Sequence, residues 1–343
     1  MRTTTLRQRL RALGAKPCHE DRVLRQWSQA LSFEGGRSRP EDFLPLAVRQ
    51  QLPVLVAELA GLARLRSRHA GDDGSERLLV ELADGQAVES VLLPRGGLCV
   101  STQVGCAVGC LFCMTGREGL LRQLGSAEIV AQVALARQLR RVNKVVFMGM
   151  GEPAHNLDNV LEAIDLLGTL GGIGHKDLVF STVGDERVFE RLPQGRVKPA
   201  LALSLHSTRA ELRARLLPRA PRWEPADLVA QGESYARATG YPIQYQWTLL
   251  QGVNDGDDEV EGIARLLHRR YAMMNLIPYN TVAGLGFSRP EGEHAAAMAR
   301  ALNRRGVLTR LRRSAGQDVE AGCGQLRARD LSHPVIKLNA LVG

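Results

Sequence analysis

The feature that most constrains the fold is a change of pattern after Cys99, where short apolar segments begin to alternate with segments of helical periodicity. The short segments have the length and composition of buried strands, and they are residues 145–148, 177–182, 201–206, 243–249, 275–277 and 307–311. Regular alternation of strands and helices predicts an α/β fold with a parallel sheet or barrel. Six such units are fewer than the eight of a closed barrel. We therefore expect an open, partial (β/α)6 barrel with its ligands at the carboxyl ends of the strands.

The part of the chain before Cys99 follows a different pattern. Residues 7–13, 21–31 and 44–65 carry apolar side chains at helical spacing. Two alternating apolar segments then flank Asp84-Gly85, a dipeptide that favours the tight turn of a β-hairpin. The expected regions are a small helical N-terminal domain over residues 1–70, a short β-hairpin linker over residues 71–98, and the barrel over residues 99–343.

Three cysteines lie close together in the spacing Cys106-x-x-x-Cys110-x-x-Cys113. Iron–sulfur clusters usually bind four cysteines. Three thiolates this close would hold three irons of a [4Fe–4S] cluster and leave the fourth iron open to a substrate or cofactor. The main alternative is a zinc site, which takes four ligands, although the next cysteine along the chain is Cys323. Buried structural thiols are a further alternative.

Cysteine content and hydropathy indicate the compartment. Six cysteines among 343 residues are too few for a disulfide scaffold. The first residues have no apolar stretch of the signal-peptide kind, and no segment approaches the roughly 20 apolar residues that span a bilayer. We therefore expect a cytoplasmic protein with no membrane partner, in a reducing compartment where thiolates stay available.

The chain is basic, with a formal net charge of +9. Residues 1–70 hold 13 Lys and Arg against 6 Asp and Glu, and residues 300–313 include six arginines and no acid. Clustered arginine suits contacts to phosphate, because the planar guanidinium group pairs with two oxygens at once. The charge pattern therefore favours a nucleic-acid partner for the N-terminal domain. The alternative is a composition bias that produces only a solvated basic surface.

A glycine-rich turn follows the strand segment 145–148 and reads Gly149-Met-Gly151-Glu152-Pro153. Glycines allow the backbone to approach a ligand closely, and a carboxylate can accept hydrogen bonds from an ammonium group or a ribose. The motif alone fits a purely structural turn equally well. The functional interpretation is favoured because the turn follows the cysteines by one βα unit, which would place both at the same end of the barrel.

The stretch around the clustered cysteines resembles the core of the RlmN/Cfr family. These are radical S-adenosylmethionine (SAM) methyltransferases that act on adenosine carbons in RNA. Other segments resemble further family signatures in the same order, and they are residues 13–17, 88–91, 148–153, 204–206, 275–280 and 323–326. The resemblance covers essentially the whole chain. Its motifs together are specific, whereas the cysteine spacing alone would indicate only a radical SAM enzyme.

The resemblance implies the cofactors and their ligands. Cys106, Cys110 and Cys113 would hold a [4Fe–4S] cluster, and its open iron would bind the amino and carboxylate groups of SAM. The positions that match SAM contacts in the family are Gly151, Glu152, Ser181, Ser204, Leu205, His206 and Asn280. An electron donor such as a flavodoxin or ferredoxin, an RNA substrate and a monomeric state are expected with these cofactors.

The resemblance also implies catalytic roles for three residues outside the cysteine run. A ring carbon of adenine has no lone pair with which to attack the methyl group of SAM. One SAM would instead methylate Cys323, since a thiolate is a competent nucleophile, and a second SAM would provide a 5′-deoxyadenosyl radical that activates this methyl group. After the methyl carbon adds to the base, Glu89 would act as the proton acceptor. Cys99 would then release the product by forming a transient disulfide with Cys323.

Two segments depart from the family pattern, namely residues 314–319 before Cys323 and residues 183–186 after Ser181. The residues that match the catalytic positions are retained, so these departures bear on which adenosine is presented and not on the chemistry. The resemblance implies methylation of a ring carbon of an adenosine, with C2 in 23S rRNA or tRNA favoured and C8 methylation of the Cfr type as the alternative, since the motifs are shared by both groups. A radical SAM enzyme with a non-RNA substrate and a non-catalytic, zinc-holding RNA-binding module are the other hypotheses.

Overall fold

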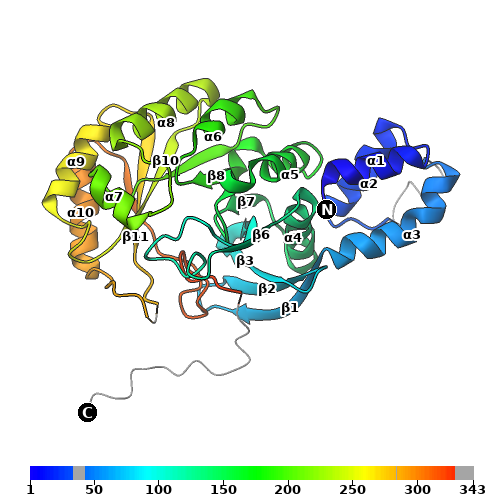
Figure 1. The fold of residues 1–343 in the computed structure, drawn as a ribbon, viewed down its shortest axis with the longest axis horizontal. Coiled ribbons are helices and arrows are strands. Elements are labelled where there is room, and N and C mark those ends of the chain that lie inside the picture. The colour runs from blue at the N-terminus through cyan, green and yellow to red at the C-terminus, as the bar shows by residue number, and fades with distance from the viewer. Residues whose placement is uncertain (34–42, 283, 329–343) are drawn as a thin grey trace, which may run out of the picture.

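The computed structural model describes residues 1–33, 43–282 and 284–328. In this part of the chain the main feature is a ten-stranded sheet, whose strand order runs from β1 through β2, β3, β4, β7, β8, β9, β10 and β11 to β12. The strands from β4 onward run parallel to one another (Figure 1). The α/β prediction and the mostly parallel, open sheet are therefore confirmed.

The parallel strands match the predicted segments closely. They are β4 (Gly97–Cys99), β7 (Lys144–Phe147), β8 (Leu178–Thr182), β9 (Ala200–Ser204), β10 (Ile243–Leu249), β11 (Ala272–Pro278) and β12 (Thr309–Leu311). The six predicted segments correspond to β7–β12. Strand β4 is an addition, because its three residues are too few to show a periodic pattern. It connects the two parts of the sheet, since Cys99 pairs with Val91 on one side and with Val146 on the other.

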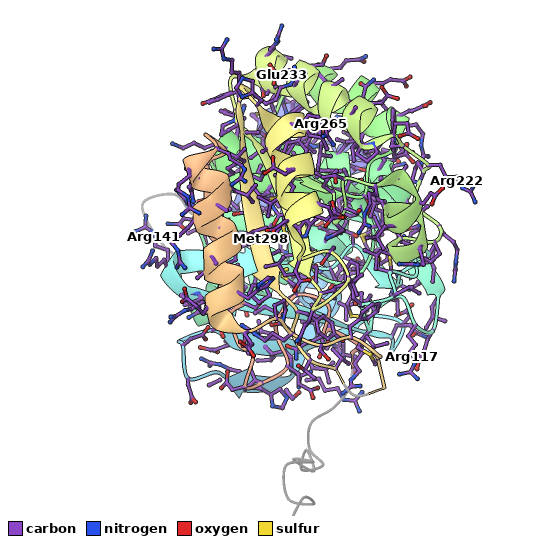
Figure 2. All side chains as sticks on the ribbon, turned by 90° about the vertical axis from the view of Figure 1, so that its left-hand side faces the viewer. Arg117, Arg141, Arg222, Glu233, Arg265 and Met298 are labelled. Atoms are coloured by element: carbon purple, nitrogen blue, oxygen red, sulfur yellow. The ribbon has the colours of Figure 1, made fainter. Side chains whose placement is uncertain are left out.

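Helices follow the parallel strands and lie along the outside of the curved sheet (Figure 1). They are α4 (Ser126–Leu139), α5 (Leu157–Thr169), α6 (Glu186–Arg191), α7 (Ala210–Leu216), α8 (Pro225–Thr239), α9 (Asp257–Leu267) and α10 (Gly292–Arg304). Figure 2 looks onto α8, α9 and α10, where Met298 is buried beneath the surface. Among the helices of the described residues, none is long and apolar enough to cross a membrane.

The predicted β-hairpin precedes the barrel. Strands β2 (Glu76–Leu82) and β3 (Ala87–Leu93) pair in antiparallel fashion, with Val80 opposite Val88. Gly85 in the connecting turn has a φ of 81°, which favours glycine. The expectation of a hairpin around Asp84-Gly85 is therefore confirmed.

The segment before the hairpin differs from the expected helix over residues 44–65. Helix α3 (Leu46–Gly61) ends earlier, and strand β1 (Ala63–Ala70) begins almost at once and pairs with β2. In β1 the exposed residues alternate with partly buried ones, which is the period of a strand and not of a helix. The expected helix was too long because the helical spacing of apolar residues in α3 continues into the first residues of β1.

The N-terminal helices pack against the barrel. Helices α1 (Thr3–Ala12), α2 (Pro17–Ser28) and α3 share one continuous apolar core with the sheet and α4. The start of α1 is fixed to the barrel, because the backbone N–H of Thr3 donates to Ser126 and its hydroxyl donates to Glu162. The division into domains at residues 70 and 98 stays a prediction.

A small two-stranded sheet sets the position of the cysteine loop. Strands β5 (Gln103–Gly105) and β6 (Leu120–Gln123) pair in antiparallel fashion on either side of the loop 106–119. At the neck of this loop, Gly105 has a φ of 79°, and a Cβ atom there would lie 2.1 Å from the carbonyl oxygen of Gly119. The N–H of Cys106 donates to the same oxygen at 2.9 Å. Only glycine at position 105 allows the neck to close in this way.

This geometry generates a prediction for the pair Gly105→Ala and Gly119→Ala. Both glycines have a φ of 79°, but nothing lies within 4 Å of a Cβ atom at Gly119. Gly119→Ala should therefore lower the free energy of unfolding only by the ~1–2 kcal/mol of the left-handed conformation. Gly105→Ala should lower it by at least twice as much, as measured by denaturant unfolding. Equal losses in the two variants would contradict the pinched neck.

Candidate active site

A cavity of about 160 Å³ lies at the carboxyl ends of the parallel strands. Its walls come from the cysteine loop, the glycine-rich turn after β7, the ends of β8–β11 and the C-terminal segment. The lining residues include Cys106, Cys110, Cys113, Gly149, Gly151, Glu152, Ser181, Ser204, His206, Gln246, Thr248 and Cys323. The fold therefore gathers residues from most of the chain at the edge where ligands of parallel sheets bind.

The three clustered cysteines lie along one wall of this cavity. Burial raises the pKa of Cys106 to about 12. Burial and the neighbouring thiols of Cys113 and Cys106 raise the pKa of Cys110 well above its usual range. Thiols in such a setting become thiolates readily only when a metal supplies positive charge. The donor set therefore fits an iron–sulfur centre.

The spacing of the thiols bears on the zinc alternative. Within residues 1–33, 43–282 and 284–328, no three His, Cys, Asp or Glu side chains are grouped closely enough to hold one metal ion. A cluster of several irons needs only one thiolate for each iron. The loop supplies three thiolates, one fewer than the four ligands of a structural zinc site.

The glycine-rich turn places Glu152 on the cavity wall. A Cβ atom at Gly151 would lie 2.6 Å from the Cβ atom of Gln103, so glycine is required for this approach. The carboxylate of Glu152 accepts backbone N–H groups of Ala154 and Val183, each at 3.1 Å. Burial nevertheless raises the pKa of Glu152 to about 7. The side chain is thus a buried acceptor that a cationic ligand would favour in its ionised form.

His206 follows β9 and has an unusual backbone conformation, with a φ of 61°. Its Nδ1 accepts the backbone N–H of Thr248 at 3.0 Å, which places the ring proton on Nε2. Burial, with a smaller effect of Arg213, lowers the pKa of His206 to about 3. The ring is therefore neutral and offers one N–H donor. Strained backbone at a non-glycine residue is frequent at functional sites.

The structure brings together most of the residues that match SAM contacts, but not all of them. Gly151, Glu152, Ser181, Ser204 and His206 line the cavity. The remaining two are not among the lining residues: Leu205 is fully buried, and Asn280 donates from its amide to the carbonyl of Cys323 at 3.0 Å. Their predicted roles are not tested by this arrangement.

Cys323 lines the cavity, and Cys99 lies within electrostatic reach of it. Cys99 ends β4 and is buried, and burial together with the Cys323 thiol raises the pKa of Cys99 to about 12. The Cys323 segment is fixed to the cysteine loop, because the N–H of Met114 donates to the carbonyl of Gly324 at 2.8 Å. All six cysteines of the chain lie among the described residues and are free thiols, so this structure contains no disulfide.

Glu89 is not part of the cavity lining. It lies on β3, where its buried carboxylate forms an ion pair with Arg77 on β2. It also accepts the backbone N–H groups of Arg327 and Ala328, at 2.7 and 3.0 Å. In this arrangement the C-terminal segment that carries Cys323 covers the predicted proton acceptor.

Sequence reasoning missed Arg213 and Gln103. Arg213 is a buried arginine on α7 beside the cavity, and Gln103 accepts the N–H of Glu152 at 2.7 Å. An arginine on a short helix is usually exposed, and nothing in the local sequence marks this one as buried. Gln103 lies just before Cys106 in the sequence, but only the fold shows its contact with Glu152.

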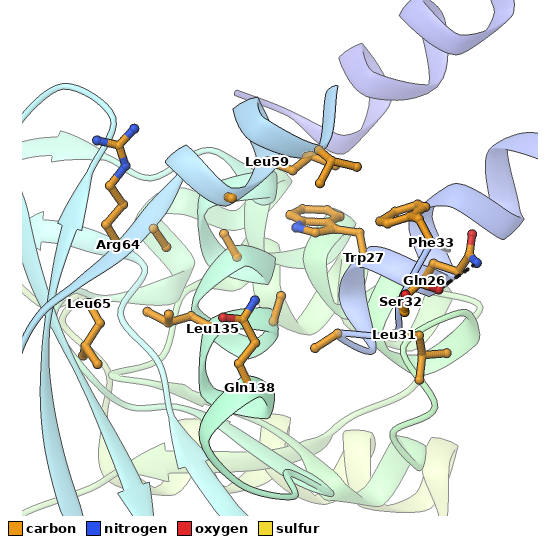
Figure 3. Close-up of a pocket in the computed structure, with 16 residues that line it drawn as sticks. Gln26, Trp27, Leu31, Ser32, Phe33, Leu59, Arg64, Leu65, Leu135 and Gln138 are labelled. Carbon is orange, nitrogen blue, oxygen red and sulfur yellow. Dashed lines mark hydrogen bonds between the residues drawn. The ribbon is translucent and has the colours of Figure 1, made fainter. Parts of the chain in front are cut away.

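A larger hollow of about 540 Å³ lies between α2, α3, α4 and β1 (Figure 3). Its walls are mostly apolar and include Trp27, Phe33, Leu59 and Leu135, and Arg64 is the one charged residue among the described side chains that line it. Within those residues the hollow lacks the thiols and carboxylates that cofactor chemistry needs. The smaller cavity at the cysteine loop is therefore the candidate active site.

Comparisons with known proteins agree with this site. The family model described as Radical SAM superfamily matches residues 100–267, and this range holds the cysteine loop, the glycine-rich turn and His206. A crystal structure of a radical SAM methyltransferase from Sphaerobacter thermophilus has a TM-score of 0.83 and 33% sequence identity, over 96% of this chain and 98% of that one. The chain therefore has the fold of a radical SAM enzyme.

Relatives of similar sequence indicate which kind of radical SAM protein this chain resembles. A protein of Leptothrix cholodnii named probable RNA methyltransferase is 76% identical over 332 residues, which are 97% of this chain and 96% of the relative. A protein of Pseudomonas aeruginosa with the name probable RNA methyltransferase PA1839 is 69% identical over 331 residues, which are 96% of each. The chain belongs to this family of radical SAM methyltransferases, which confirms the resemblance found in its motifs. Membership implies a [4Fe–4S] cluster and SAM as cofactors.

The cysteine geometry predicts which thiols retain iron. Replacing Cys106, Cys110 or Cys113 by Ala should lower the iron and sulfide content several-fold after purification without oxygen, since each thiolate would hold its own iron. The exposed Cys18 serves as the control, and Cys18→Ala should keep the full content. Full iron in any of the three loop variants would contradict the assignment.

The raised pKa of Glu152 predicts a dependence of stability on pH. Its pKa of about 7 in the folded state lies above the ordinary 4.5. The protonated side chain therefore stabilises the fold fully below about pH 4.5, and this contribution, ~3 kcal/mol, is lost as pH rises through 7.

Denaturant unfolding of the cluster-free protein between pH 5 and 8 measures this effect. Glu152→Gln should lose less stability than the wild type over that range, because glutamine does not titrate. The exposed Glu186→Gln is the control and should follow the wild-type curve. Parallel curves for all three proteins would contradict the buried, protonated carboxyl group.

Proposed function

We propose that this protein methylates a ring carbon of an adenosine in RNA, with C2 favoured, in 23S rRNA or tRNA. The methyl group would pass through Cys323. The observation that carries the proposal is the position of Cys323, which lines the same cavity as the three loop cysteines. The names of the relatives support RNA as the substrate.

Cys106, Cys110 and Cys113 would hold the cluster, and the adjoining strand ends would hold SAM. When bound, the cluster supplies electrons, and SAM supplies both the methyl group and the precursor of the radical. Two SAM molecules would be used in each turnover. The electron would come from a small donor protein such as a flavodoxin or ferredoxin.

The chain's own residues suit the groups of SAM. Glu152 would accept hydrogen bonds from the ammonium group, and this contact would bring its pKa back toward the usual range of a carboxylate. His206 would donate from Nε2, since its Nδ1 is already occupied. Ser181 and Ser204 add hydroxyl groups at the ends of β8 and β9. These residues would orient SAM against the cysteine loop.

Cys323 has the surroundings expected of a carrier. It lies between two glycines and is exposed at the cavity mouth. Cys99, whose pKa is raised in part by the Cys323 thiol, would attack the sulfur of Cys323 as a thiolate and displace the carbon of the methylated product, so that an S–S bond replaces the S–C bond in a transient disulfide. Attack by Cys99 needs its thiolate, and removal of its proton would therefore be coupled to this step.

Glu89 would be the proton acceptor, although the C-terminal segment covers it. Its carboxylate can reach a base in the cavity only when the N–H groups of Arg327 and Ala328 release it. The loop that carries Cys323 would therefore move during the cycle. Arg77 would keep the Glu89 carboxylate in place on β3 while that loop moves.

RNA would be bound by basic surfaces outside the cavity. The N-terminal region is strongly basic, and Arg64, Arg66 and Arg68 lie exposed along the edge strand β1. Arginine rows of this kind suit a phosphate backbone. The protein would act as a monomer, with the barrel mouth supplying the contact to the base.

Analysis of RNA nucleosides tests the proposal. The reconstituted protein, given SAM and a reductant, should add methyl to C2 of adenosine, as identified by mass spectrometry against synthetic standards. Cys323→Ala should lower product formation at least a hundredfold, because no other thiol occupies that position, whereas Cys18→Ala should leave it unchanged. Product at C8 would favour the alternative, and full activity of Cys323→Ala would refute the carrier role.

A further inference from the structure

Arg213 is a buried cation that forms no direct ion pair with a carboxylate among the described residues. Its side chain is 2% exposed. Its guanidinium group donates to three backbone carbonyls, those of Val183, Ser204 at 3.2 Å and Pro221 at 3.3 Å. Across residues 1–33, 43–282 and 284–328 it takes part in no ion pair, and its Nε–H is buried without a hydrogen-bond partner.

Such an arrangement is unfavourable by itself. A buried charge is normally paired, because its loss of hydration is large. A buried N–H without an acceptor loses the hydrogen bond that water would provide. The buried charge without a direct ion pair is the feature that points to an anionic group beyond the amino-acid side chains, and a bound cofactor would supply one.

The position of α7 indicates which cofactor this is. The carbonyl of Leu216 on α7 accepts the N–H of Leu111 in the cysteine loop at 3.0 Å. Just after the helix, the N–H of Arg219 donates to the carbonyl of Val108 in the same loop at 3.3 Å. Leu216 also shares an apolar cluster with Cys106. Helix α7 and the residues just after it therefore pack directly against the cysteine loop.

The electrostatics agree with this geometry. Burial lowers the pKa of Arg213 to about 10, which leaves it charged at neutral pH, and Cys110 and Glu152 favour the charged form. The peptide of Val183 connects the two sides of the site, since its N–H donates to Glu152 and its carbonyl accepts from Arg213. Arg213 thus lies within electrostatic reach of both the cysteine loop and the SAM pocket.

We propose that Arg213 is a positioning residue that offsets the negative charge of the iron–sulfur cluster and favours its reduced form. Reduction adds one electron from an external reductant and makes the cluster more negative by one charge, with no proton taken from Arg213. A fixed cation in a low-dielectric site stabilises that state, and charge and hydrogen bonds near the sulfurs set the potential of such clusters. The inference rests on the proposed function only in placing the cluster at the three loop cysteines.

The experiment measures the cluster and not methyl transfer. Wild-type protein, Arg213→Met, Arg213→Lys and Arg215→Met are reconstituted without oxygen, and their iron and sulfide contents are determined first. Each is then titrated with dithionite at fixed potentials in the absence of SAM, and the reduced cluster is followed by electron paramagnetic resonance. Arg215 is the matched control, since it lies exposed on the same helix and its replacement removes the same charge.

At the potential where the wild type is half reduced, Arg213→Met should show a ratio of reduced to oxidised cluster about tenfold lower. This corresponds to about 59 mV for a one-electron couple. Arg213→Lys keeps the charge but loses the planar group, so its ratio should fall less. Arg215→Met should match the wild type, because water screens an exposed charge.

Two results would overturn the inference. One is an unchanged ratio in Arg213→Met, including the case in which only its melting temperature falls, which would make the residue merely structural. The other is an equal shift in Arg213→Met and Arg215→Met. If Arg213→Met does not fold, Arg213→Gln, which also removes the charge, replaces it in the titration, and an unchanged ratio in Arg213→Gln refutes the proposal. Absence of iron from the wild type would instead refute the proposed function itself.

Discussion

The candidate site depends on how the free-energy cost of burying acidic side chains is offset. The fold buries Glu152 and two of the loop thiols at the carboxyl end of the parallel sheet, and burial raises the pKa of each. These groups are suited to bind positive charge, which iron and the ammonium group of SAM both supply. Each cofactor would therefore relieve a cost that the fold alone bears.

The same constraint explains why the site is assembled from distant segments. The cysteine loop is closed at its neck by Gly105 and supported from behind by α7. The segment with Cys323 returns from the far edge of the sheet and contacts this loop through Gly324. The same segment buries Ala321 and Leu326 in the main apolar core.

Much of the fold can be predicted from the sequence. Buried parallel strands are short, continuously apolar segments, and such segments are recognisable in the sequence. Strands β7–β12 appear in the pattern, and the hairpin is marked by Asp84-Gly85. Two strands could not be predicted from the sequence pattern, and each has a physical reason. Strand β4 has three residues and no period, and β1 follows a helix whose apolar spacing continues into it.

The site was predictable where chemistry requires a fixed spacing and less so where it depends on burial. The loop cysteines and the Gly151-Glu152 turn are visible in the sequence, and the cavity contains them. The sequence does not show that Glu89 is covered by Arg327 and Ala328, because that contact joins residues far apart in the chain. Arg213 escapes notice for the same reason, since only the packing of α7 makes it a buried charge.

The most direct measurement of the central claim is the location of a labelled methyl group on the protein. The reconstituted enzyme is incubated with SAM that carries an isotopically labelled methyl group, without RNA, and its peptides are analysed by mass spectrometry. The account predicts one label on Cys323 and none on Cys99 or Cys18. An unlabelled Cys323 in a preparation that still methylates RNA would contradict it.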